Sequence, residues 1–143
     1  MIILDTNALS ELMKIDPDPT VRAWFSRQER LNLFITSITE AEIWQGIELL
    51  PDGRRRRLLE QAAITMIARD FSGRTLGFDS RAAESYGKLA AELRKAGRSI
   101  GMADIQIAAI ARVHGFAVAT RNTRHFTDCG IELIDPFTAT AGR

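Results

Sequence analysis

Short, wholly apolar runs recur along the chain and alternate with longer amphipathic stretches. Such a run is typical of a strand that is buried on both faces. Apolar residues at helical spacing, bounded by capping residues and glycines, predict helices between the runs. The predicted strands cover residues 2–4, 33–36, 74–78, 116–120 and 131–133, and the predicted helices cover approximately residues 7–13, 20–28, 39–50, 54–69, 80–95 and 103–113.

Capping residues set several of the predicted helix ends. Ser37 or Thr39 is expected to cap the helix at 39–50, because a hydroxyl at that place can accept a backbone N–H. Gly115 is expected to stop the helix at 103–113, which is apolar on almost every side and is therefore expected to be buried on more than one face. Other predicted features are a cap at Asp79 or Ser80, a helix end at Gly97, and core positions for Trp24, Trp44 and Ile47.

Alternation of strands with helices predicts an α/β protein with a central, mostly parallel sheet of four to five short strands. Helices are expected on both faces, which makes a three-layer α/β/α sandwich, and residues 1–143 show no boundary for a second domain. In such sheets functional groups gather at the carboxyl ends of the strands. Asp5, Thr36 and the run Thr120-Arg121-Asn122 follow predicted strands directly, so we expect them at that edge.

Composition is that of an ordinary globular protein, with 45% hydrophobic and 26% charged residues among 143. The net charge of +1 hides an asymmetry: residues 1–53 hold nine acids and four bases, whereas residues 54–143 hold nine acids and fifteen bases. Basic clusters of this kind can bind phosphates or can simply be solvated. A single cysteine, Cys129, excludes an internal disulfide and fits the reducing cytoplasm. No apolar run approaches the roughly 20 residues of a membrane span.

Three acidic residues stand in apolar surroundings where a carboxylate is costly. Asp5 closes the first strand, Glu42 lies among Ile43 and its apolar neighbours, and Asp104 opens the most apolar helix. Each could have a structural role, as a cap, a first-turn acid or a solvated helix position. If they converge, each pair at about 5 Å repels by roughly 3 kcal/mol at an effective dielectric of 20. Either a carboxylate is then protonated or a cation binds, with Mg²⁺ or Mn²⁺ as the natural occupant.

The sequence resembles the PIN-domain ribonucleases, and in particular the VapC-type toxins of bacterial toxin–antitoxin pairs. Four segments carry the resemblance, in the family's order and over nearly the whole chain: IILDTNALSEL, ITEAEIWQGIELLP, GRSIGMADIQIAAIARVHG and AVATRNTRHF. The resemblance implies a PIN-like α/β/α sandwich and Mg²⁺-dependent hydrolysis of RNA. It also implies a homodimer, and as partner a small antitoxin with a DNA-binding domain that blocks the site.

By this resemblance Asp5, Glu42 and Asp104 occupy the family's acidic metal-binding positions and are its catalytic residues. The family's glutamate stands four residues before a glycine, as Glu42 does before Gly46; Glu40, the other candidate from the residues alone, does not. The remaining site predictions are support of the metal site by Thr6, Asn7, Thr120 and Asn122, and contacts to RNA phosphate by Arg121 and Arg124.

The turn after the fourth predicted strand departs from the family's common pattern. Many members carry a fourth acid there, whereas this chain has Asn122. An amide adds no negative charge, so the departure argues against a stable second metal ion in the free protein.

Other kinds of protein also end a first strand on an aspartate. A haloacid-dehalogenase-type phosphatase wants a second aspartate where Asn7 stands, and a receiver domain wants an acidic pair and a lysine that are missing. Neither His114 nor His125 has a plausible nucleophile partner. The main alternative is a PIN-like fold that acts as a non-catalytic nucleic-acid-binding or protein-binding module. RNA and DNA both stay open as targets from the residues alone, since none reads a 2′-hydroxyl.

Overall fold

The apolar runs of the sequence form one five-stranded sheet in the order β3-β2-β1-β4-β5, in which every neighbouring pair is parallel. The computed structural model describes residues 1–138. The strands are β1 (Ile2–Leu4), β2 (Leu33–Thr36), β3 (Thr75–Leu76), β4 (Ala117–Ala119) and β5 (Leu133–Ile134). The prediction of four to five short strands in a parallel sheet is therefore confirmed. The predicted domain, 1–143, includes residues 139–143, which lie outside the described residues.

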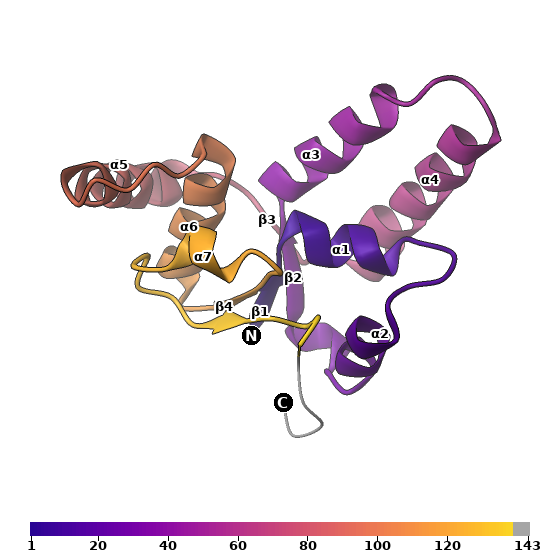
Figure 1. Ribbon diagram of the computed structural model, residues 1–143, viewed down its shortest axis with the longest axis horizontal. Coiled ribbons are helices and arrows are strands. Elements are labelled where there is room, and N and C mark those ends of the chain that lie inside the picture. Colours follow the sequence, from indigo (N-terminus) through magenta and orange to yellow (C-terminus); the bar gives the residue numbers. More distant parts are fainter. Residues whose placement is uncertain (139–143) are drawn as a thin grey trace.

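Helices connect the strands and cover both faces of the sheet (Figure 1). Figure 1 places α1 to α4 on one side and α5 to α7 on the other, with α3 and α4 extending away from the sheet as a hairpin. This is the predicted three-layer sandwich. The helices are α1 (Thr6–Leu12), α2 (Pro19–Ser26), α3 (Ser37–Glu48), α4 (Arg54–Thr65), α5 (Ser80–Lys95), α6 (Met102–His114) and α7 (Thr123–Phe126), with a 3₁₀ turn η1 (Arg30–Asn32) and a π-helical turn η2 (Met66–Asp70).

Alternate residues of the central strands pack into two separate hydrophobic clusters, one on each face of the sheet. Ile3 and Val118 point into the cluster beneath α5 and α6, whereas Leu4 and Ala119 point into the cluster beneath α1 to α4. Both faces of β1 and β4 are thus buried, which explains why their sequences are apolar without alternation. α6 is buried along most of its length, as its apolar sequence predicted. Trp24 and Ile47 lie in the core, as expected, with Trp44 partly buried against it.

Three predicted elements differ from the structure in their extent, in ways that the neighbouring elements explain. β3 is confined to Thr75–Leu76, since only these residues pair with Ile35 and Thr36 of β2. β5 begins at Leu133 rather than residue 131, because Leu133 is the partner of Val118 in β4. The helix predicted at 54–69 ends as an α-helix at Thr65 and continues as the wider turn η2.

The N-terminus of α3 is also capped differently from the prediction. The capping residue is Thr36, whose side-chain oxygen accepts the backbone N–H of Thr39 at 3.1 Å, so the expected cap at Ser37 or Thr39 is wrong. The helix therefore begins directly at the end of β2. Asp79 caps α5, and Gly115 ends α6 in the left-handed region with φ 68°, as predicted. No helix within residues 1–138 is both long enough and apolar enough to cross a membrane.

Candidate active site at the carboxyl edge of the sheet

The carboxyl ends of β1, β2 and β4 meet at one edge of the sheet, because the three strands are parallel neighbours. Asp5 follows β1 directly, and its backbone N–H donates to the carbonyl of Ala119 at the end of β4 (2.9 Å). Thr36 ends β2, and Thr120 follows β4. The sheet thus gathers the polar residues that the sequence placed at strand ends.

Asp5 is a buried carboxylate with 4% of its surface exposed. Its Oδ1 accepts the backbone N–H of Thr6 (2.8 Å), and its Oδ2 accepts the Thr120 hydroxyl (2.8 Å) and the Asn7 side-chain amide (3.1 Å). Burial raises the pKa of Asp5, and the charges of Asp104 and Glu42 raise it further, while the hydrogen bonds from Thr120 and Thr6 oppose the rise. The fold therefore holds this acid where its ionised form is unfavourable.

Glu42 reaches the same edge from α3. Its Oε1 accepts a hydrogen bond from the Thr6 hydroxyl at 2.6 Å, and the Thr6 and Thr39 hydroxyls lie 3.0 Å apart. Because α3 begins at Ser37, directly after its cap Thr36, this glutamate lies in the second turn of the helix, beside the start of α1. Of the two glutamates that the sequence offered, Glu42 and not Glu40 makes this contact.

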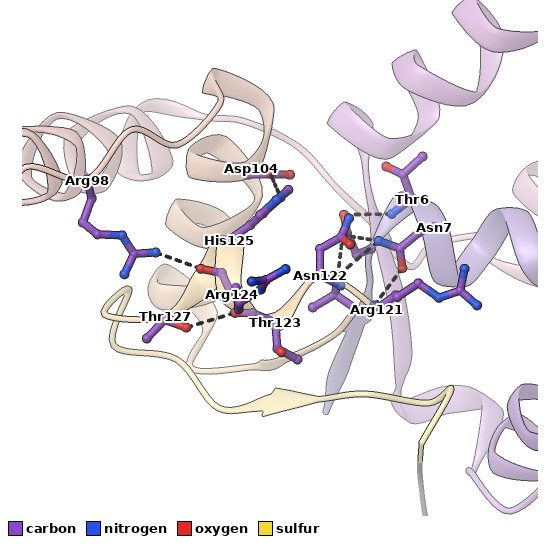
Figure 2. A network of polar contacts seen from close by, with 12 residues as sticks. Thr6, Asn7, Arg98, Asp104, Arg121, Asn122, Thr123, Arg124, His125 and Thr127 are labelled. Atoms are coloured by element: carbon purple, nitrogen blue, oxygen red, sulfur yellow. Dashed lines mark hydrogen bonds and ion pairs between the residues drawn. The ribbon is translucent and has the colours of Figure 1, made fainter.

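Asp104 lies in the first turn of α6 with its side chain one-quarter exposed. Its Oδ2 lies 3.0 Å from Nδ1 of His125, which is carried by α7 (Figure 2). The sequence predicted neither α7 nor a contact of His125 with Asp104. The spacing of His125, three residues after Asn122, does not by itself indicate a contact with Asp104.

Asn7 and Thr120 tie the turn after β4 to the start of α1. The Asn7 side-chain oxygen accepts the backbone N–H of Arg121 (3.0 Å), and its nitrogen donates to the Thr120 hydroxyl oxygen (3.2 Å). The Thr120 hydroxyl oxygen also accepts the backbone N–H of Asn122 (3.0 Å). Asn7 thus contacts Asp5, Thr120 and the following turn at once, and these contacts fix the two central strand ends relative to each other.

The two arginines predicted to contact phosphate are exposed on this turn and on α7. The guanidinium carbon of Arg121 lies over the Phe137 ring, 3.7 Å from its centroid, which is within the range of a cation–π contact. Arg124 accepts a hydrogen bond at its carbonyl from Arg98 Nη2 (2.8 Å). Both arginines stay candidates for phosphate contacts.

The donor chemistry of the three carboxylates fits a hard divalent cation, since all their donor atoms are oxygens and Asp5 is buried with a raised pKa. The carboxylates are near enough for Glu42 and Asp104 to act on Asp5 electrostatically. Across residues 1–138, however, no three acidic, histidine or cysteine side chains are arranged as a ready-made ligand set. In this arrangement the Glu42 carboxylate accepts a hydrogen bond from Thr6, and Oδ2 of Asp104 contacts His125.

Comparison with known proteins places this geometry in a family. Residues 2–130 match the PIN domain. The chain is 42% identical to "VapC ribonuclease Y4jK" of Sinorhizobium fredii over 137 residues, 96% of this chain and 98% of that protein. It is 34% identical to "Toxin FitB" of Neisseria gonorrhoeae over 137 residues, 96% of this chain and 99% of that protein.

Solved structures agree with the sequence comparison. The crystal structure of FitAcB from Neisseria gonorrhoeae superposes with a TM-score of 0.90 at 33% identity, over 97% of this chain and 100% of that chain. DNA-bound VapBC from Salmonella typhimurium superposes with a TM-score of 0.79 at 29% identity, over 94% and 97% of the two chains. The fold, the sequence match over nearly its full length and the acidic sheet edge agree: the chain belongs to the PIN-domain family, and the relatives it matches include VapC-type toxins.

Proposed function

We propose that this chain is a divalent-metal-dependent endoribonuclease that hydrolyses RNA phosphodiester bonds, and that it is the toxin of a toxin–antitoxin pair. One observation carries the proposal: the buried carboxylate of Asp5 lies at the carboxyl edge of a parallel sheet, within electrostatic reach of Glu42 and Asp104. Carboxylates grouped in this way favour a bound cation, and oxygen donors favour Mg²⁺ or Mn²⁺. RNA as substrate is supported by relatives named as VapC ribonucleases.

Asp5 and Asp104 would bind the cation directly, and Glu42 directly or through a water molecule. When bound, such an ion supplies Lewis-acid chemistry that activates water and offsets negative charge on the phosphate. Thr120 and Asn7 donate hydrogen bonds to Asp5 and so favour its ionised, ligating form. Asn122 adds no negative charge to the site. The three carboxylates balance the charge of one divalent ion fully, but the charge of two such ions only in part. We therefore expect one stable ion in the free protein.

Substrate contacts come from the chain's own side chains around that edge. Thr6 holds Glu42 beside α1, where its carboxylate would orient the attacking water. Arg121 and Arg124 would bind the phosphates that flank the scissile bond. A guanidinium that is already held over an aromatic ring, as Arg121 is over Phe137, loses less conformational freedom when it binds a phosphate.

An antitoxin partner is supported by the solved relatives, which include DNA-bound VapBC of Salmonella typhimurium and FitAB bound to a DNA fragment. We expect a small antitoxin with a DNA-binding domain that covers the acidic edge, and a homodimer of this chain in the complex. Co-purification with the product of the neighbouring gene, followed by mass measurement of the free and bound forms, tests both expectations.

The nuclease proposal is tested by cleavage of single-stranded and structured RNA by the purified chain, with Mg²⁺, with Mn²⁺ and with EDTA. Asp5→Asn and Asp104→Asn are expected to abolish cleavage. Asp16→Asn is the matched control, because Asp16 lies on the surface, 95% exposed, in an ion pair with Arg22. Cleavage that survives chelation and both site variants would refute the metal mechanism. Binding of RNA without cleavage would favour the non-catalytic module, and cleavage of DNA alone would reassign the substrate.

A further inference from the structure

The imidazole of His125 contacts Asp104, one of the proposed cation ligands, although nothing in the proposed chemistry requires a histidine. Nδ1 of His125 lies 3.0 Å from Oδ2 of Asp104, and the two side chains are 56% and 25% exposed. A carboxylate offers only acceptors, so Nδ1 must carry the hydrogen in this contact.

The short helix that carries His125 is fixed by contacts outside itself. α7 has only four residues, which is too few for a helix to be stable alone. Phe126 is 1% exposed and anchors α7 in the cluster beneath α5 and α6. The backbone N–H of His125 donates to the carbonyl of Asn122 (3.0 Å), which continues the turn from β4. The position of the imidazole is thus set by the core and by β4.

Arg98 fixes the outer side of α7. Its Nη2 donates to the carbonyl of Arg124 (2.8 Å), the residue before His125, and its Nη1 contacts Oδ2 of Asp128 (2.9 Å). Arg98 itself is placed by the end of α5: Gly97 has φ 74°, and the Arg98 N–H donates to the carbonyl of Leu93 (2.9 Å). Figure 2 shows the sequence of contacts from Arg98 through the Arg124 backbone to His125 and Asp104.

We propose that His125 is a positioning residue: held by Arg98 through the backbone of α7, it fixes the Asp104 carboxylate through Oδ2 and leaves Oδ1 for the divalent cation. The inference rests on the proposed metal-dependent nuclease. Side chains that hydrogen-bond to a ligating group orient it, and their loss typically weakens metal binding about 10- to 100-fold. An Asp104 without this partner would have to lose rotational freedom when the ion binds.

The test is Mn²⁺ binding to the purified full-length chain, measured by isothermal titration calorimetry. His125→Phe keeps a ring but removes the N–H donor, and it is expected to weaken Mn²⁺ binding at least about tenfold. His125→Asn keeps a donor, since the amide nitrogen of Asn takes nearly the place of Nδ1, and it is expected to bind within about threefold of wild type. Arg98→Lys, which keeps the charge but loses the two-pronged contact, should give an intermediate loss. His114→Phe is the matched control, because His114 is an exposed histidine at the other end of α6.

RNA cleavage gives a second measurement. If His125 acts through Asp104, the cleavage defect of His125→Phe shrinks as Mn²⁺ is raised, because excess metal compensates for weak binding. Thermal melts without metal should be close to wild type for both His125 variants, since the side chain is mostly exposed.

Each outcome separates the inference from the function on which it rests. Unchanged Mn²⁺ binding by His125→Phe, with binding and cleavage intact in wild type, overturns the positioning role and leaves the nuclease proposal standing. Equal losses in the Asn and Phe variants also overturn it, because the imidazole and not the N–H donor would then matter. If Arg98→Lys binds Mn²⁺ as tightly as wild type, Arg98 does not help to hold His125, and that part of the inference is wrong. A wild-type chain that neither binds Mn²⁺ nor cuts RNA overturns the proposed function and the inference together.

Discussion

Among the hydrogen bonds of Asp5, the one from the Thr120 hydroxyl does most to stabilise the ionised carboxylate. Removal of this hydroxyl gives a quantitative prediction. Thr120 is fully buried, donates to Asp5 Oδ2 (2.8 Å) and accepts the backbone N–H of Asn122 (3.0 Å). Thr120→Val replaces the hydroxyl with a methyl group of similar size, so the shape of the core is retained. The change removes one of the three hydrogen-bond donors of the Asp5 carboxylate, and both the Asn122 backbone N–H and the Asn7 side-chain amide lose Thr120 as an acceptor.

A hydrogen bond to a charged group contributes about 1.5–3 kcal/mol, and an unpaired N–H that water partly reaches adds a smaller cost. We therefore expect Thr120→Val to lower the free energy of unfolding by about 3 kcal/mol at pH 8, which corresponds to a fall in Tm of about 10 °C. Thr120→Ser keeps the hydroxyl and loses one buried methyl group, which costs about 1 kcal/mol. Thr120→Ser should thus be more stable than Thr120→Val, although valine is the more hydrophobic residue.

The assay is urea unfolding of the metal-free chain at about pH 8 and about pH 4. The Thr120 hydrogen bond lowers the pKa of Asp5, so its contribution is present where Asp5 is ionised and is lost as pH falls through the folded-state pKa. The difference between the Val and Ser variants should therefore shrink at about pH 4. If Thr120→Val is as stable as Thr120→Ser at pH 8, the hydroxyl does not support Asp5 and the reasoning fails.

Three further predictions concern the buried acid, a helix end and the core. Burial raises the pKa of Asp5 above 3.8, so its contribution to stability falls as pH rises from 3.8 through the folded-state pKa. In EDTA, urea unfolding should show wild type losing stability relative to Asp5→Asn as pH rises above about 4. Mg²⁺ should raise the Tm of wild type but not of the variant. Gly115→Ala should cost about 1 kcal/mol in thermal unfolding, because φ is 68° while the space around a new Cβ is open. Phe126→Ala should cost about 3–5 kcal/mol in the same assay, since the ring is 1% exposed.

Features that depend on neighbouring residues in the chain could be predicted from the sequence. The apolar runs at β1, β2 and β4 specify strands buried on both faces, and Asp79 and Gly115 specify helix ends through local hydrogen bonds and backbone conformation. The parallel order of strands then brings Asp5 to the same edge as the turn after β4. The predicted cap of α3 was wrong by one residue or more. Three hydroxyl residues within four positions could each cap the helix, and which of them does so depends on where β2 ends.

Features that depend on distant contacts could not be predicted. α7 is too short to show periodicity, and it is held by Arg98, 26 positions away from Arg124. The contact between His125 and Asp104 spans 21 positions and leaves no pattern in either segment. The same reason explains the shortened β3, whose extent is set by the residues of β2 that it meets. Family resemblance named Asp104 but not the histidine that contacts it.

The span of the hydrogen bond between Asp5 and Thr120, 115 positions, has a consequence for synthesis of the chain. The first strand leaves the ribosome early, but its neighbour β4 and the turn that supports Asp5 come near the end. At about 5–20 residues per second, the 143-residue chain takes roughly 7–30 s to make. Pairing of segments so far apart is slow, because a long loop must close before any contact compensates for its entropy. A prematurely terminated chain that stops before residue 117 contains Asp5, Glu42 and Asp104 but lacks β4 and Thr120. The complete site therefore forms only when synthesis is almost finished.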